Sequence, residues 1–136
     1  MDVTNRSVVD LIRGRRSRAL FKVQPIFNDV HWLPGLMPEN VRREPDIANA
    51  FIFKRGGAAY LVDSGVGPGF RQALSGFFAG WRYESVTLIN THLHTDHISN
   101  NDLLNEIDAG EKTHLIHPAG VPYLDTYEWM KSELRT

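Results

Sequence analysis

Short apolar runs alternate along the chain with turn-forming stretches, which is typical of a layered sheet with helices. Two β-prone runs, Ile47 to Lys54 and Ala58 to Val62, flank Arg55-Gly56-Gly57. Because Gly-Gly suits a tight turn, this stretch predicts a β-hairpin. An earlier apolar run, Leu20 to Val23, predicts a strand edged by Pro25.

Residues 31–46 contain three Pro and one Gly, a composition that cannot continue a central strand. They predict a loop that could form a lid or a substrate-contacting hairpin. His31 and Trp32 in this loop could touch substrate, although packing within the loop is the favoured interpretation.

Helical and strand patterns alternate in the second half of the chain. Pro68 is suited to the first turn of a helix that continues to about Phe78. The run from Val86 to Asn90 has no charge, as expected of a strand buried on both faces. Further predicted elements are a helix over residues 97–107 closed by Ala109-Gly110, a strand from Thr113 to Ile116, and a final helix from Val121 to Leu134.

The bulk composition indicates one domain over residues 1–136. A net charge of -1 predicts no general attraction to nucleic acid or to a membrane, and the cluster of four Arg from Arg13 to Arg18 is interpreted as a solvated loop. The absence of Cys excludes disulfides, thiolate nucleophiles and Cys-ligated metals. No apolar stretch has the length of a signal peptide or a membrane span, so we expect a cytoplasmic location.

The densest chemistry follows the charge-free strand, where Thr-His-Leu-His-Thr-Asp-His occupies residues 91–97. Side chains at i and i+2 of an extended segment point the same way, so His92 and His94 can face one ion. Asp96 and His97 can reach a neighbouring ion at a turn into a helix. Capping of that helix by Thr95 or Asp96 is the simpler interpretation, but it leaves the three His unexplained.

Imidazole and carboxylate donors suit zinc, with iron or manganese as other options. A catalytic zinc ion keeps one position open for water, whose pKa falls toward about 7. Hydrolysis by zinc-bound hydroxide is therefore the chemistry that this donor set favours.

The run from His92 to His97 resembles the His-x-His-x-Asp-His signature of the metallo-β-lactamase superfamily. The stretch from Asn49 to Gly65, which ends in Asp-Ser-Gly, is similar to the family hairpin that precedes this signature. The resemblance spans residues 47–118. It implies an α+β fold, half of an αββα sandwich with a mixed sheet and helices on one face.

The resemblance also implies roles for individual residues. His92 and His94 would bind a first metal ion, and Asp96 and His97 a second, so that zinc, as two ions in the complete fold, is the expected cofactor. Asp96 would act catalytically by bonding the attacking water or protonating the leaving group. Asp63 would orient a ligand by hydrogen bonding, although a simple turn role is an equal alternative.

Two departures from the family pattern bear on this interpretation. Ile98-Ser99-Asn100-Asn101 stands where the family often has two Gly before Asn. The family takes further ligands from a second half, and neither His114 nor His117 resembles one of them, so the domain is expected to be incomplete, a fragment.

The leading hypothesis is a metal-dependent hydrolase of small molecules with an ester, thioester, lactone or β-lactam bond. One alternative is a truncated, non-catalytic metal-binding half-domain that needs a missing C-terminal half or a partner, including a second copy of the chain. Such a half-domain would leave one sheet face apolar and uncovered. Another alternative is an iron-dependent oxygenase of the same superfamily.

Overall fold

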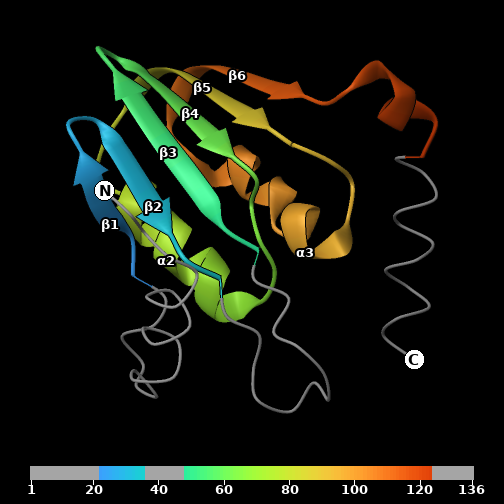
Figure 1. Cartoon of the computed structure of the whole chain (residues 1–136). Helices are drawn as coiled ribbons and strands as arrows, with labels where there is room; N and C mark the ends of the chain where they lie inside the picture. Colours follow the sequence, from blue (N-terminus) through green and yellow to red (C-terminus); the bar gives the residue numbers. More distant parts are fainter. Residues whose placement is uncertain (1–21, 36–47, 124–136) are drawn as a thin grey trace, which may run out of the picture.

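The computed structural model describes residues 22–35 and 48–123, which build one twisted sheet with helices on one side (Figure 1). Six strands follow each other across the sheet in chain order. They are β1 (Gln24–Phe27), β2 (Val30–Leu33), β3 (Ala50–Arg55), β4 (Ala58–Val62), β5 (Tyr83–Ile89) and β6 (Ala109–Leu115). The helical elements are α2 (Pro68–Phe78), α3 (Thr95–Ile98) and two 3-10 helices, η2 (Asn101–Glu106) and η3 (Pro118–Tyr123). This is the expected α+β architecture with a mixed sheet.

The direction of the strands changes in the middle of the sheet. Strands β1 to β4 are joined as antiparallel neighbours, whereas β4, β5 and β6 run parallel. The β3–β4 connection is the predicted hairpin, and Gly56 at its tip has a φ of 59°, which glycine adopts without strain. The C-terminal ends of β4, β5 and β6 consequently meet at one edge of the sheet, where polar loops begin (Figure 1).

The core lies between the sheet and α2. Leu74 on the helix and Ile52 on β3 are each 0% exposed, and Phe70 is 1% exposed. The predicted helix from Pro68 to Phe78 is confirmed, with Phe70, Leu74 and Phe78 on its buried side. Alternation along β3 and β4 sends Phe53 and Tyr60, which are register partners, to the other side of the sheet, where each is 39% exposed. The sheet is therefore well packed on the helical side and keeps exposed aromatic residues on the other.

The predicted loop at residues 31–46 is wrong in its first part. Residues 30–33 form β2, paired with β1 and with β3. Leu33 is 0% exposed, and Trp32 Nε1 donates to Asn49 Oδ1 at 2.9 Å. Pro34 and Gly35 follow the strand rather than interrupt it, so these four residues can pair on both sides. Residues 36–46 lie outside the described part of the chain.

The predicted helix over residues 97–107 is also wrong, because it is two elements. Helix α3 ends at Ile98 and η2 begins at Asn101. Between them, Asn100 Nδ2 donates to the carbonyl oxygens of Ser64 at 3.1 Å and of Gly67 at 3.3 Å. A polar side chain that satisfies neighbouring backbone in this way competes with helix continuation.

The remaining element boundaries differ in smaller ways. Ala109 and Gly110 begin β6 rather than close a helix, and β5 starts at Tyr83, before the predicted Val86. Strand β5 also alternates between fully and partly buried residues instead of being buried on both faces. The strand predicted from Leu20 to Val23 precedes β1 and lies partly outside the described residues. Most of the final predicted helix and the whole Arg13 to Arg18 cluster also lie outside them. No helix in the described ranges is long and apolar enough to cross a membrane.

Candidate metal centre

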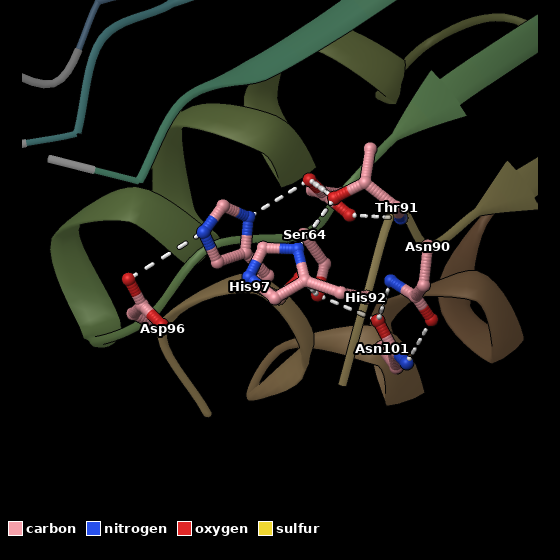
Figure 2. Close-up of polar contacts among 8 residues, drawn as sticks. Ser64, Asn90, Thr91, His92, Asp96, His97 and Asn101 are labelled. Carbon is pink, nitrogen blue, oxygen red and sulfur yellow. Dashed lines mark hydrogen bonds and ion pairs between the residues drawn. The ribbon is translucent and has the colours of Figure 1, made fainter. Parts of the chain in front are cut away.

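The four predicted ligands lie just beyond the end of β5, at the edge where the parallel strands finish. Figure 2 shows His92, Asp96 and His97 among them. His92 lies in a bend after β5, and His94 has extended backbone directly before α3. Asp96 and His97 lie within that helix. His92 and His94 are exposed, whereas Asp96 and His97 are partly buried. The segment thus presents its first two imidazoles to solvent and holds the last one against the protein.

Asp63 fixes this segment from beneath. It follows β4, is 3% exposed, and has a φ of 59°, a left-handed conformation that Asp tolerates better than most residues. Its Oδ1 accepts from the Thr91 N–H at 2.8 Å, and its Oδ2 accepts from the Thr91 hydroxyl at 2.7 Å. Oδ2 also lies 2.8 Å from His97 Nδ1. Both carboxylate oxygens are therefore engaged with the ligand segment.

The contact with Asp63 determines which His97 nitrogen faces outward. With Nδ1 donating to the carboxylate, Nε2 is left as the free lone-pair nitrogen. That Nε2 lies 3.5 Å from Asp96 Oδ2. His97 therefore contacts the buried carboxylate of Asp63 on one side and the partly exposed carboxylate of Asp96 on the other.

Three imidazole rings gather at this point. The His92 ring centroid is 4.0 Å from that of His97 and 4.7 Å from that of His94. His92 Nδ1 is 2.9 Å from the Thr91 hydroxyl. Within the described residues, His92 Nε2 makes no hydrogen bond. Thr91 therefore contacts both Asp63 and His92. Thr91 was not identified from the sequence as part of the site.

These residues fit a zinc ion in donor type and in tautomer, because a hydrogen-bonded Nδ1 commonly accompanies metal ligation by Nε2. The donor atoms of the four residues are not close enough together to surround one ion. Across residues 22–35 and 48–123, no three His, Asp or Glu side chains are grouped so that they could hold a metal ion together. The ligand roles of the four residues remain a prediction from the sequence.

Below the ligand segment lies a second polar layer, built from Ser64, Asn90 and Asn101 (Figure 2). Ser64 Oγ donates to Asn101 Oδ1 at 2.7 Å, and Asn101 Nδ2 donates to Asn90 Oδ1 at 2.8 Å. The Ser64 N–H donates to the His97 carbonyl at 2.9 Å. Sequence reasoning missed this layer; its signals were polar Asn90 directly after β5 and polar Ser64 shortly after β4.

The other His residues lie apart from the four predicted ligands. His114 on β6 contacts Asn90 through Nε2 at 2.6 Å, and burial lowers its pKa below the ordinary 6.5. His117 follows β6 and accepts from the Ala119 N–H at 3.2 Å. His31 lies in β2, with its ring centroid 4.9 Å from that of Phe77 on α2, so it packs between strand and helix and not within a loop as expected.

A family model described as the Metallo-beta-lactamase superfamily matches residues 43–135. No curated protein matches the chain significantly.

Two similar solved structures come from bacteria. A beta-lactamase domain protein from Burkholderia ambifaria is 22% identical, with a TM-score of 0.46, and the match covers 67% of this chain and 31% of that one. The metallo-beta-lactamase FIM-1 from Pseudomonas aeruginosa, in its mono-zinc form, is 18% identical, with a TM-score of 0.47, and the match covers 68% and 41%. The chain therefore matches less than half the length of each of these proteins.

Proposed function

Because the chain belongs to the metallo-beta-lactamase superfamily, we propose that it acts as a metal-dependent hydrolase at the edge where its four candidate ligands gather. Members of this superfamily are mostly hydrolases and typically bind zinc. The substrate class that we propose is a small molecule with an ester, thioester, lactone or β-lactam bond.

The observation that carries the proposal is the contact of buried Asp63 with His97. A carboxylate on Nδ1 keeps the ring in one tautomer and one orientation, as expected for a metal ligand. A carboxylate that is 3% exposed must be hydrogen-bonded, and all the side-chain partners of Asp63 lie in the ligand segment. The same carboxylate holds Thr91, next to His92, so one buried group orders both ends of the ligand segment.

Each residue has a role that follows from its position. We assign His92 and His94 to one ion, because they are exposed and separated by one residue. Asp96 lies beside His97 with its side chain 24% exposed, so it can accept a proton from water and return one to the leaving group. A bound zinc ion would polarise the bond to be cleaved and lower the pKa of the attacking water toward about 7.

Zinc binding and turnover of the whole chain test the proposal together. Chelator-stripped protein is titrated with zinc in competition with a chromophoric chelator, then assayed on a panel with one substrate for each of the four bond classes. We expect His92→Ala to lose affinity and activity and His117→Ala to keep both, because His117 lies beyond β6 and contacts no candidate ligand. Equal activity before and after removal of the metal would contradict a metal-dependent mechanism.

Metal binding without turnover is the second candidate. The absence of three grouped donors in the described residues weighs against a complete catalytic centre, whereas a pair of imidazoles can still bind zinc weakly. Stoichiometric zinc binding that depends on His92, with no hydrolysis of any substrate on the panel, would support it. Turnover that requires iron and dioxygen instead would favour redox chemistry.

A further inference from the structure

Two carboxamides close the base of the ligand segment. Asn90 precedes His92 by two residues, and Asn101 follows His97 by four, so the pair brackets all four candidate ligands. Asn90 Nδ2 donates to Asn101 Oδ1 at 3.2 Å, and Asn101 Nδ2 donates to Asn90 Oδ1 at 2.8 Å (Figure 2). We propose that this reciprocal pair, the amide clasp, is a positioning device that orders the segment before metal binds. The inference rests on the proposed function for its second half, the effect on metal affinity.

The clasp is anchored to the strands on both sides of β5. Ser64, after β4, donates through Oγ to Asn101 Oδ1 at 2.7 Å. His114, on β6, lies with Nε2 2.6 Å from Asn90 Oδ1 and donates to it, because a carboxamide oxygen only accepts. Asn90 also donates its backbone N–H to the Leu115 carbonyl at 3.0 Å. Three parallel strand ends therefore hold one pair of side chains.

Burial makes the loss of these hydrogen bonds energetically costly. Ser64 is 0% exposed and Asn90 is 5% exposed, so solvent has little access to replace a lost partner. A buried carboxamide that loses its partner bears the full desolvation cost of an unsatisfied polar group. The closed arrangement is therefore favoured over an open one in the metal-free protein.

The clasp acts on the ligands indirectly. Within the described residues, neither Asn90 nor Asn101 hydrogen-bonds to a side chain of the four candidate ligands. What the clasp does is bring together two positions that are eleven residues apart, which removes the entropy of an open loop before any ion arrives. A site that is ordered in advance binds more tightly than one that must be ordered on binding.

Asn101→Leu, which removes the amide at similar size, tests the clasp, with Asn105→Leu as the matched control on the same helix η2. Asn105 is exposed, and its backbone carbonyl accepts from Lys112 Nζ at 3.0 Å, whereas its side chain makes no hydrogen bond within the described residues. Ser64→Ala is a milder second variant that removes one anchor without adding volume. All are measured as full-length, metal-free protein by amide hydrogen exchange, and then by competitive zinc titration.

We expect Asn101→Leu to accelerate exchange of the Thr91, His97 and Ser99 amides about tenfold or more, with smaller acceleration in Ser64→Ala. The amides of β4 and β5 should keep their wild-type rates, and zinc affinity should fall about tenfold. Asn105→Leu should change neither quantity.

Unchanged exchange in Asn101→Leu would overturn the clasp whether or not metal binds. Equal acceleration in the segment and in β4 and β5 would indicate general destabilisation and would overturn it too, as would faster exchange with unaltered zinc affinity. If wild-type protein binds no zinc while exchange responds as expected, the proposed function fails, and the clasp is retained as a device that orders the segment.

Discussion

Asp63 combines three properties in one residue. It is buried, its backbone is left-handed, and its carboxylate contacts the N–H and hydroxyl of Thr91 and Nδ1 of His97. The left-handed backbone lies directly after β4, where the side chain reaches both Thr91 and His97. A residue that was only a turn former would not need both carboxylate oxygens, which favours the orienting role over the turn role.

We expect Asp63→Asn to weaken zinc binding about 10- to 100-fold. Asn tolerates the left-handed backbone and keeps the volume, but its amide group cannot accept from Thr91 and His97 as the carboxylate does. Competitive zinc titration measures the change, with exposed Asp29→Asn, which removes the same charge in the β1–β2 turn, as control. Equal affinities in the two variants would remove Asp63 from the site.

Gly65 sits two residues further on, where a side chain has no room. Its φ is 66°, and a Cβ there would lie 2.3 Å from the Phe70 ring, which is itself 1% exposed. We expect Gly65→Ala to lower the free energy of unfolding by about 2 kcal/mol or more, through backbone strain and overpacking.

Gly76 provides the opposite case, because it lies in α2 with open space around its Cα. Gly76→Ala should raise the free energy of unfolding by about 0.5 to 1 kcal/mol, since Ala loses less backbone freedom in a helix. Urea unfolding midpoints compare both variants with wild type. A higher midpoint for Gly65→Ala would contradict the crowding at Gly65, and a lower midpoint for Gly76→Ala would contradict the open space at Gly76.

At the scale of elements, α3 is held by its neighbours rather than by its own propensity. It has four residues and no side-chain cap, too short to be stable alone. Ile98 at its end is 2% exposed and forms a bridge with Gly65, and the His97 carbonyl accepts from the Ser64 N–H. The orientation of Asp96 and His97 thus depends on the loop after β4.

Strand β6 contributes a titrating group through His114. Burial lowers its pKa, so in the acid range the unfolded chain binds more protons at this residue than the folded protein does. Its contribution to stability is constant above the unfolded value of 6.5 and falls as the pH drops below it. Because the residue is exposed as a whole, we expect a small effect.

Thermal unfolding across pH 7 to 5 measures this effect as the difference between wild type and His114→Gln. Between pH 7 and pH 5, the unfolding temperature of wild type should fall further than that of the variant. Parallel curves for the two proteins would exclude His114 as the source of any acid sensitivity in this range.

These elements also mark the limit of sequence reasoning. The β3–β4 hairpin and α2 were predictable because Gly-Gly, Pro68 and the apolar spacing act locally. The break between α3 and η2 was not, because it depends on Asn100 reaching the Ser64 and Gly67 carbonyls across the fold. The four candidate ligands could be named from their spacing, whereas the clasp joins residues whose pairing only the folded sheet reveals.

At the scale of the whole molecule, everything assigned to the site comes from one edge of the sheet. Asp63, Asn90 and the ligand segment follow β4 and β5, in the place where open sheets with parallel strands bind ligands. Metal binding at that edge would reinforce the contacts between the loops that follow β4 and β5. Its effect should therefore appear in the stability of the entire fold.

We expect zinc at about 100 times its dissociation constant to stabilise the chain by about 2.7 kcal/mol, because only the folded state brings the ligands together. This zinc-dependent rise in the unfolding temperature should be absent in His92→Ala and present in His117→Ala. Differential scanning calorimetry with and without zinc measures it. A zinc-independent unfolding temperature in wild type, at zinc levels that saturate the chelator competition, would contradict folding-linked binding.

The antiparallel return from β3 to β4 puts the hairpin tip at the end of the sheet away from the ligands, roughly 17 Å along a five-residue strand. Arg55 at that tip is exposed, and the natural chain contains no Cys. Arg55→Cys therefore creates a single thiol for a fluorophore or a surface tether, at a place where attachment leaves the imidazoles unobstructed. The topology that gathers the chemistry at one edge thus leaves the opposite edge as a handle for spectroscopy and immobilisation.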